Sequence, residues 1–118
     1  MTSPARDPRF DILFEPVQIG PVRTKGRCCQ VPHCNGMGRG RPATLAAMRG
    51  VKAGGGWGVV CTEEIEISPF SEIAPHFEGR IWDERDMPAL QLMTDACHAH
   101  GALAGAEIFF NGYATPNR

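Results

Sequence analysis

The chain has 118 residues, a formal net charge of −1, 42% apolar residues and 21% charged residues, which is the composition of one small globular domain. Its basic residues are spread along the sequence, and no apolar run reaches the roughly 18 residues of a membrane helix, so we expect neither nucleic acid nor a membrane as partner. The first residues also lack the apolar core of a secretory signal, which favours a cytoplasmic protein.

The five cysteines make an odd number at irregular spacings, without a C-x-x-C pair. Adjacent cysteines such as Cys28 and Cys29 rarely bridge, because the geometry is strained. We therefore expect reduced thiols rather than a disulfide framework. A metal site that draws on Cys34, Cys61 and the histidines lacks the tight paired spacing of zinc ligands, so the sequence favours no metal ion.

The predicted elements alternate between strands and helices along the chain. In order they are a hairpin over 14–24, a strand over 28–31, a helix from 42 to the glycines at 54–56, a strand over 57–62, a helix from 86–88 to 101, and a strand over 102–109. The stretch 63–84 has no clear periodicity and is expected to be a long loop. The final segment, 111–118, is also expected to be loop.

Helical spacing predicts the apolar face of each helix. The periodic positions are Leu45, Met48, Val51 and Lys52 in the first helix, and Leu90, Met93, Thr94 and Cys97 in the second. The β-α-β-α-β order predicts a parallel α/β sheet with right-handed crossovers. The strands have the near-continuous apolar pattern of strands buried on both faces, yet two helices cover only one face. The chain therefore resembles a piece of a larger fold.

The first candidate for chemistry is Cys34, which stands beside His33 past the end of the first predicted strand. In parallel α/β proteins, ligands bind at the carboxyl ends of the strands. A thiol beside a histidine there could have a lowered pKa and act as a redox sulfur, a metal ligand or a cofactor attachment point. A cysteine in a turn without any role fits the sequence equally well.

Carboxylates follow the other strands. Glu63 and Glu64 stand at the tip of the second predicted strand, where they could act as bases, bind a cationic substrate, or be solvated loop charges. Glu107 lies inside an apolar strand, and a buried carboxylate must find donors or become protonated, which makes it a functional candidate. The glycines of the loop 36–40 lack the dinucleotide-binding spacing and the Walker lysine, so turn flexibility is their expected role.

Several longer motifs occur in a fixed order. They are Asp11-Ile12-Leu13-Phe14-Glu15-Pro16, Gln30-Val31-Pro32-His33-Cys34, Lys52-Ala53, Gly55-Gly56-Trp57, Thr62-Glu63, Arg80-Ile81-Trp82-Asp83 and Gly101-Ala102-Leu103-Ala104-Gly105. Together they resemble the N-terminal part of the Old Yellow Enzyme-like FMN oxidoreductases, most closely the trimethylamine, dimethylamine and histamine dehydrogenase branch. The resemblance covers nearly the whole chain.

The resemblance implies a TIM (β/α)8 barrel with a hairpin that closes its N-terminal end. A complete barrel needs roughly 200–250 residues, so residues 1–118 are expected to be a truncated, partial FMN-binding barrel of a hairpin and about three β/α units. FMN would lie across the carboxyl ends of the strands. The cofactor-binding residues that the resemblance implies are Val31, Pro32, His33, Cys34, Glu64 and Glu107.

Three of these residues have distinct implied roles. Cys34 matches the cysteine that forms a thioether to the flavin ring in the amine dehydrogenases. Glu64 would lie beside flavin and substrate as the catalytic candidate, and Glu107 would face the pyrimidine edge of the flavin. Because Glu64 stands where the trimethylamine enzyme has an aromatic residue, the resemblance implies a different, more polar amine.

The implied activity is oxidation of a small amine, by dehydrogenation or demethylation, with flavin as hydride acceptor. A 4Fe–4S cluster and a nucleotide would belong to a C-terminal part absent from these residues, and the full-length form is expected to allow homo-oligomers. Two alternatives are an ene-reductase-type NAD(P)H:flavin oxidoreductase, in which Cys34 tunes the flavin without a covalent bond, and a truncated product without activity. The isolated chain is expected to be inactive.

Overall fold

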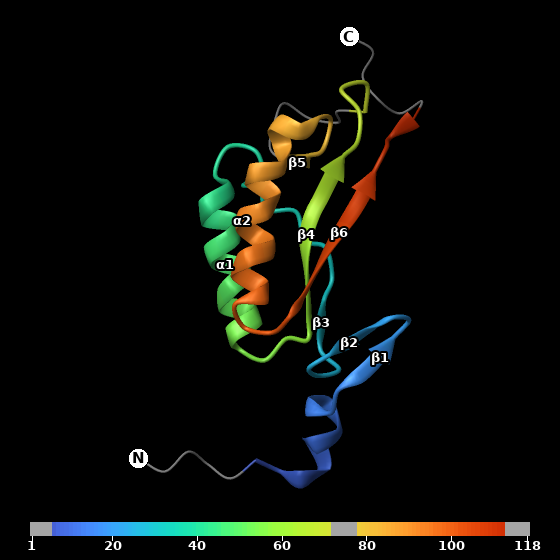
Figure 1. Cartoon of the computed structure of the whole chain (residues 1–118), viewed down its shortest axis with the longest axis vertical. Helices are drawn as coiled ribbons and strands as arrows, with labels where there is room; N and C mark the ends of the chain where they lie inside the picture. The colour runs from blue at the N-terminus through green and yellow to red at the C-terminus, as the bar shows by residue number, and fades with distance from the viewer. Residues whose placement is uncertain (1–5, 72–77, 113–118) are drawn as a thin grey trace.

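The computed structural model describes residues 6–71 and 78–112 (Figure 1). Its elements are the 3-10 helix η1 (Pro8–Phe14), the strands β1 (Val17–Ile19), β2 (Val22–Thr24) and β3 (Cys29–Gln30), the helix α1 (Pro42–Gly54), the strands β4 (Val59–Glu66) and β5 (Gly79–Arg80), the 3-10 helix η2 (Glu84–Asp86), the helix α2 (Met87–His98) and the strand β6 (Leu103–Phe109). The predicted order of hairpin, strands and helices is confirmed.

The strand β4 is the centre of a parallel sheet. One edge of β4 pairs with β6 along most of its length, and the other edge pairs with β3 near its start and with β5 at its end. Both long helices lie on the same face of this sheet (Figure 1). Parallel strands joined by helices on one face are the β/α arrangement that the sequence predicts.

The hairpin β1–β2 is antiparallel and lies at the N-terminal end of the parallel strands (Figure 1). Gly20 has a φ of 53°, a left-handed conformation that favours glycine in a two-residue turn. The helix η1 precedes the hairpin and was not predicted. The Asp7 side chain accepts a hydrogen bond from the Arg9 N–H, and Pro8 suits the first helical turn, so the Asp-Pro pair was the available signal.

The core lies between the two helices and the sheet. Its buried members are Ala46, Ala53, Val60, Met93, Cys97 and Ala102. The predicted face of α2 is confirmed, since Met93 and Cys97 are buried. The predicted face of α1 is confirmed at Leu45, which is 5% exposed, and wrong at Val51, which is 77% exposed. The helices pack through small residues instead, and a Cβ on Gly50 would lie 3.4 Å from the Ala96 Cβ.

The strand β4 extends four residues past its predicted end, to Glu66. The prediction of a loop from residue 63 is therefore wrong at its start, because the carboxylates there hide the apolar pattern of a strand. The short elements β5 and η2 also fall inside that predicted loop. Residues 72–77, and residues 113–118 of the predicted final loop, lie outside the described residues.

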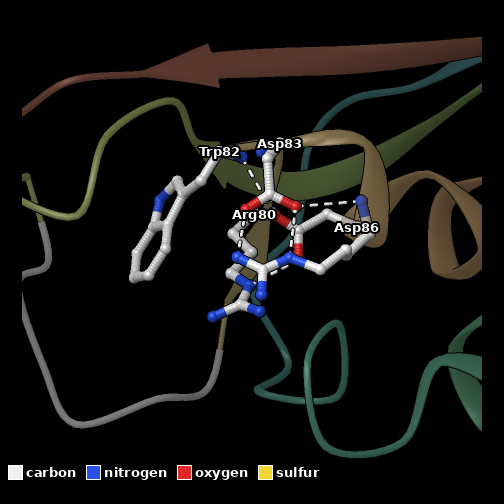
Figure 2. Close-up of polar contacts among 5 residues, drawn as sticks. Arg80, Trp82, Asp83 and Asp86 are labelled. Carbon is white, nitrogen blue, oxygen red and sulfur yellow. Dashed lines mark hydrogen bonds and ion pairs between the residues drawn. The ribbon is translucent and has the colours of Figure 1, made fainter.

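The Arg-Ile-Trp-Asp motif forms a polar cluster between β5 and α2 (Figure 2). The Asp86 carboxylate is 7% exposed and accepts hydrogen bonds from Arg80 Nε at 2.5 Å and from the Trp82 N–H at 3.0 Å. The Arg80 guanidinium also lies 4.6 Å from the centre of the Trp82 ring, and Asp83 caps η2. These contacts therefore fix the position of the turn that precedes α2.

The face of the sheet away from the helices is open. The Gln30 side chain contacts Arg49 of α1, so the next residue, Val31, faces away from the helices and is 66% exposed. This agrees with the prediction that two helices cover only one face of strands whose pattern is apolar on both. In the part of the chain that the structure describes, no helix is long and apolar enough to cross a bilayer.

Candidate functional site

The carboxyl ends of β3, β4 and β6 bring three predicted side chains together. Glu64 on β4 is the register partner of Glu107 on β6, and the backbone of Glu64 hydrogen-bonds the Cys34 thiol beyond β3. The ladder between β3 and β4 continues past β3, because the His33 N–H donates to the Thr62 carbonyl at 3.4 Å. Cys34, Glu64 and Glu107 therefore form one candidate site.

A register shift in β4 decides which carboxylate faces this site. Cys61 pairs with Gly105 and Glu64 pairs with Glu107, so β4 carries one more residue than β6 between these pairs. Side chains alternate along a strand, and such a bulge reverses the alternation beyond it. Glu64 consequently lies on the same face as Cys61, and Glu63 does not.

Glu63 has a different environment from either predicted one. Its side chain is completely buried, so it is neither a solvated loop charge nor a group on the ligand face. Oε2 accepts the Asn35 N–H at 3.1 Å, and Oε1 accepts the Gly38 N–H at 2.6 Å. Glu63 thus binds the backbone of the loop that follows Cys34.

The glycine-rich loop packs closely instead of cradling a phosphate. A Cβ on Gly38 would lie 2.6 Å from the Gly79 nitrogen and would also collide with Glu63 Oε1. Gly36 has a φ of 68°, which favours glycine, whereas a Cβ on Gly40 would meet open space. Turn flexibility explains Gly36, but close packing explains Gly38.

Arg49 is a residue of the site region that the sequence analysis missed. It lies on the buried face of α1 and is 0% exposed. Its Nη1 donates to Gln30 Oε1 at 3.0 Å and its Nη2 donates to the His33 carbonyl at 2.7 Å. Burial lowers the pKa of the Arg49 guanidinium, and the negative charge of Glu63 opposes this shift. The sequence carried no signal for these contacts, because both acceptors lie on a different element.

The pKa of the Cys34 thiol is raised from its ordinary value, so the expectation of a lowered pKa beside His33 is wrong. Although the Cys34 residue is exposed, its thiol loses part of its hydration against the strand ends, which is the main cause, and the negative charges of Glu64 and Glu63 add to it. The hydrogen bond from the Glu64 backbone opposes the shift without reversing it. Cys34 is therefore a protonated thiol at neutral pH in the absence of a ligand.

The other predicted cofactor-binding residues lie around this site. Val31 and His33 are exposed at the end of β3, and Pro32 is half-buried between them. Glu107 is exposed on the open face, so the expectation of a buried carboxylate is wrong in this structure. The reason is that the helices cover only the opposite face of β6.

Among the described residues, the remaining thiols and histidines form no further site. All five cysteines are free, and the Cys29 and Cys61 thiols hydrogen-bond each other on the open face of the sheet. Over residues 6–71 and 78–112, no group of three or more His, Cys, Asp or Glu side chains has an arrangement that could hold a metal ion.

Glu64 is expected to make stability depend on pH. Partial burial, and then the charges of Glu107 and other carboxylates, raise its pKa above the ordinary value of 4.5. At pH values between the ordinary pKa and the raised pKa of the folded state, the folded protein holds more protons than the unfolded chain. The free energy of unfolding therefore falls as pH rises through this range. Replacing Glu64→Gln should therefore increase the free energy of unfolding at neutral pH by about 0.2–1 kcal/mol. Urea unfolding measures this change, and an equal gain in strong acid would contradict it.

Comparisons with known proteins identify relatives of the chain over most of its length. Residues 12–117 match the profile of the NADH:flavin oxidoreductase / NADH oxidase family. Dimethylamine dehydrogenase from Hyphomicrobium sp. (strain x) is 49% identical over 112 residues, which cover 95% of this chain and 15% of that enzyme. The 4,4'-dithiodibutanoate disulfide reductase of Rhodococcus erythropolis is 34% identical over 98 residues, which cover 81% of this chain and 24% of that enzyme.

Several solved structures also superpose on this chain. Histamine dehydrogenase from Rhizobium sp. 4-9 superposes with a TM-score of 0.90 at 53% identity, over 95% of this chain and 17% of that chain. The 6-hydroxypseudooxynicotine amine oxidase of Pseudomonas geniculata N1 has a TM-score of 0.85 at 47% identity, over 90% of this chain and 16% of that chain. The old yellow enzyme from Trypanosoma cruzi shares the fold, with a TM-score of 0.75 at 17% identity.

Proposed function

Because the chain belongs to the NADH:flavin oxidoreductase / NADH oxidase family, we propose that its strand ends form part of an FMN site of an enzyme that oxidises a small amine. The chain spans about a sixth of the length of the amine-oxidising relatives that it matches. The proposed amine oxidation would therefore belong to a longer assembly, in which these 118 residues are joined by the remainder of the barrel. One observation supports the proposal most directly. Cys34, Glu64 and Glu107 meet where parallel α/β proteins bind ligands.

The residues at the strand ends fit the ring half of FMN. Val31 offers an exposed apolar surface, Cys34 an exposed thiol, and Glu107 an exposed carboxylate that can accept a hydrogen bond from a ring N–H. When bound, FMN would supply the acceptor for the hydride of the amine. Glu64, beside Cys34, would bind the cationic amine and orient it.

Cys34 would also tether the ring. Cys34 would hold the ring through its sulfur, and bound FMN, re-oxidised by dioxygen to give hydrogen peroxide, would supply the two-electron oxidation that a carbon–sulfur bond to it requires. The thiol must first lose its proton. Because burial and nearby carboxylates raise the pKa of Cys34, its proton loss has to be promoted by the bound ring or by groups outside the described residues.

Several finer attributes are proposals of the same kind. We infer a more polar amine than trimethylamine as substrate, a 4Fe–4S cluster and a nucleotide in the longer assembly, a cytoplasmic location and a homo-oligomer. The cytoplasmic location rests on the sequence, and the other attributes rest on the resemblance to the amine dehydrogenases. Of the described residues, Glu64 is the one that bears on the substrate, since a carboxylate favours a cationic amine.

A chimera tests the covalent attachment. We expect residues 1–112, joined to the remainder of the Rhizobium histamine dehydrogenase, to retain flavin in the acid-precipitated protein, and Cys34→Ser to release it. Cys29→Ser is the matched control, because Cys29 is also exposed at the open face and should not affect retention. Flavin that leaves with the supernatant in the unsubstituted chimera would favour the non-covalent, ene-reductase-type alternative.

A further inference from the structure

The peptide groups on both sides of Cys34 are held by two buried charged side chains from other elements. The His33 carbonyl accepts a hydrogen bond from Arg49 of α1 at 2.7 Å, and the Asn35 N–H donates to Glu63 of β4 at 3.1 Å. Arg49 and Glu63 are both 0% exposed. Cys34 is thus the single residue between two anchored peptide groups.

Arg49 has strong reasons to keep this position. A buried cation is costly unless it is paired and hydrogen-bonded. Its two Nη atoms donate to acceptors on Gln30 and His33, which are close together in the sequence. The negative charge of Glu63 also favours the charged form of the arginine. Since both acceptors belong to β3 and its end, the arginine fixes the strand end relative to α1.

Glu63 fixes the other side of Cys34. Its two oxygens take one N–H each, from Asn35 and from Gly38, so a single carboxylate spans four residues of the loop. The approach to Gly38 is possible because that residue has no side chain. Without Glu63 these two N–H groups would have to find other partners, and an unpaired buried donor is costly.

Regular structure does little to hold Cys34 by itself. The strand β3 has only two residues, and past it the ladder to β4 continues through one long hydrogen bond, from the His33 N–H to the Thr62 carbonyl at 3.4 Å. We propose that Arg49 and Glu63 are positioning residues that together set the place and reactivity of the Cys34 thiol. The relevance of this role to flavin attachment rests on the proposed function, but the role itself does not.

Thiol alkylation of the 118-residue chain, without flavin, tests this proposal. Iodoacetamide labelling followed by peptide mass spectrometry gives a separate rate for each cysteine. In Arg49→Gln and in Glu63→Gln we expect the rate at Cys34, relative to exposed Cys29, to rise about tenfold, the factor that one lost buried hydrogen bond corresponds to. In Glu63→Gln the pH midpoint of Cys34 labelling should also fall toward that of an ordinary thiol, because a negative charge that raises the pKa of Cys34 is removed.

The other cysteines serve as internal controls. Cys97 is 0% exposed in the core, so its labelling reports unfolding and should stay slow. Lys52→Gln on α1 and Glu84→Gln on η2 remove the same charges without touching the loop and should leave the ratio unchanged. Glu63→Asp and Arg49→Lys keep the charge, and they should change the ratio less than the glutamine variants.

Two results would overturn the proposal. One is an unchanged Cys34-to-Cys29 ratio in both glutamine variants, together with an unchanged pH midpoint in Glu63→Gln. The other is equal acceleration of Cys34 and Cys97 in every Arg49 and Glu63 variant, the conservative ones included, because residues that only hold the fold would have that effect. The proposed function fails separately, since loss of flavin from the acid-precipitated chimera leaves the alkylation result unaffected.

Discussion

Replacing Gly38→Ala is expected to lower the free energy of unfolding by about 3 kcal/mol. The new Cβ would lie 2.6 Å from the Gly79 nitrogen and 2.9 Å from the Gly79 Cα, which are backbone atoms that cannot rotate away. It would also collide with Glu63 Oε1, the acceptor of the Gly38 N–H. The loop therefore has to move, and it loses its hydrogen bond to Glu63 when it does.

Gly40→Ala is the matched control in the same loop. Nothing lies within 4 Å of a Cβ on Gly40, and its backbone is not left-handed, so the substitution should leave stability unchanged or raise it slightly. Urea unfolding followed by tryptophan fluorescence compares the two variants. Equal midpoints for Gly38→Ala and Gly40→Ala would show that the loop does not pack against β5 and Glu63 as the structure describes.

The order of the elements was predictable because the residues that start and end each element act locally. The turn at Gly20-Pro21 and the proline that opens α1 each act within a few residues, and the apolar run of β6 is long enough to be recognised. The face of α1 was only partly predictable in this way. Its contact with α2 depends on small residues such as Gly50, and these carry almost no hydrophobic signal.

The candidate site was also predictable only in part. That Cys34 and the carboxylates follow strand ends could be inferred from the sequence, and the structure brings Cys34, Glu64 and Glu107 together. Simple alternation from Cys61 would have put Glu63 on the open face. The bulge in β4 is a property of the pairing with β6, so only the structure could show that Glu64 takes that place.

The role of Arg49 also lay outside the sequence analysis. An isolated arginine in a helix is most simply a solvated charge, and its acceptors on Gln30 and His33 come from a different element. Long-range polar contacts of this kind have no spacing rule. They are found only when the elements are placed in space, and here they connect the helix α1 to the residue that precedes Cys34.

Replacing Asp86→Ala is expected to lower the free energy of unfolding by about 2–4 kcal/mol. The substitution removes the partner of Arg80, whose side chain is 28% exposed, and leaves that cation partly buried without its carboxylate. It also leaves the N–H groups of Trp82 and Asp83 without their acceptor at the turn that starts α2. Figure 2 shows how these groups converge on the one carboxylate.

Two further variants separate charge from position in this cluster. Asp83→Ala removes the ion pair between Asp83 and Arg85, whose side chains are 41% and 85% exposed, respectively. Because solvent screens that pair, the substitution should lower the free energy of unfolding less than Asp86→Ala does. Asp86→Asn keeps one acceptor oxygen for the backbone but loses the charge, so its loss should lie between the other two. Equal urea midpoints for Asp83→Ala and Asp86→Ala would contradict this order. The predicted order follows from burial, because the same carboxylate–arginine contact stabilises more where water cannot replace it.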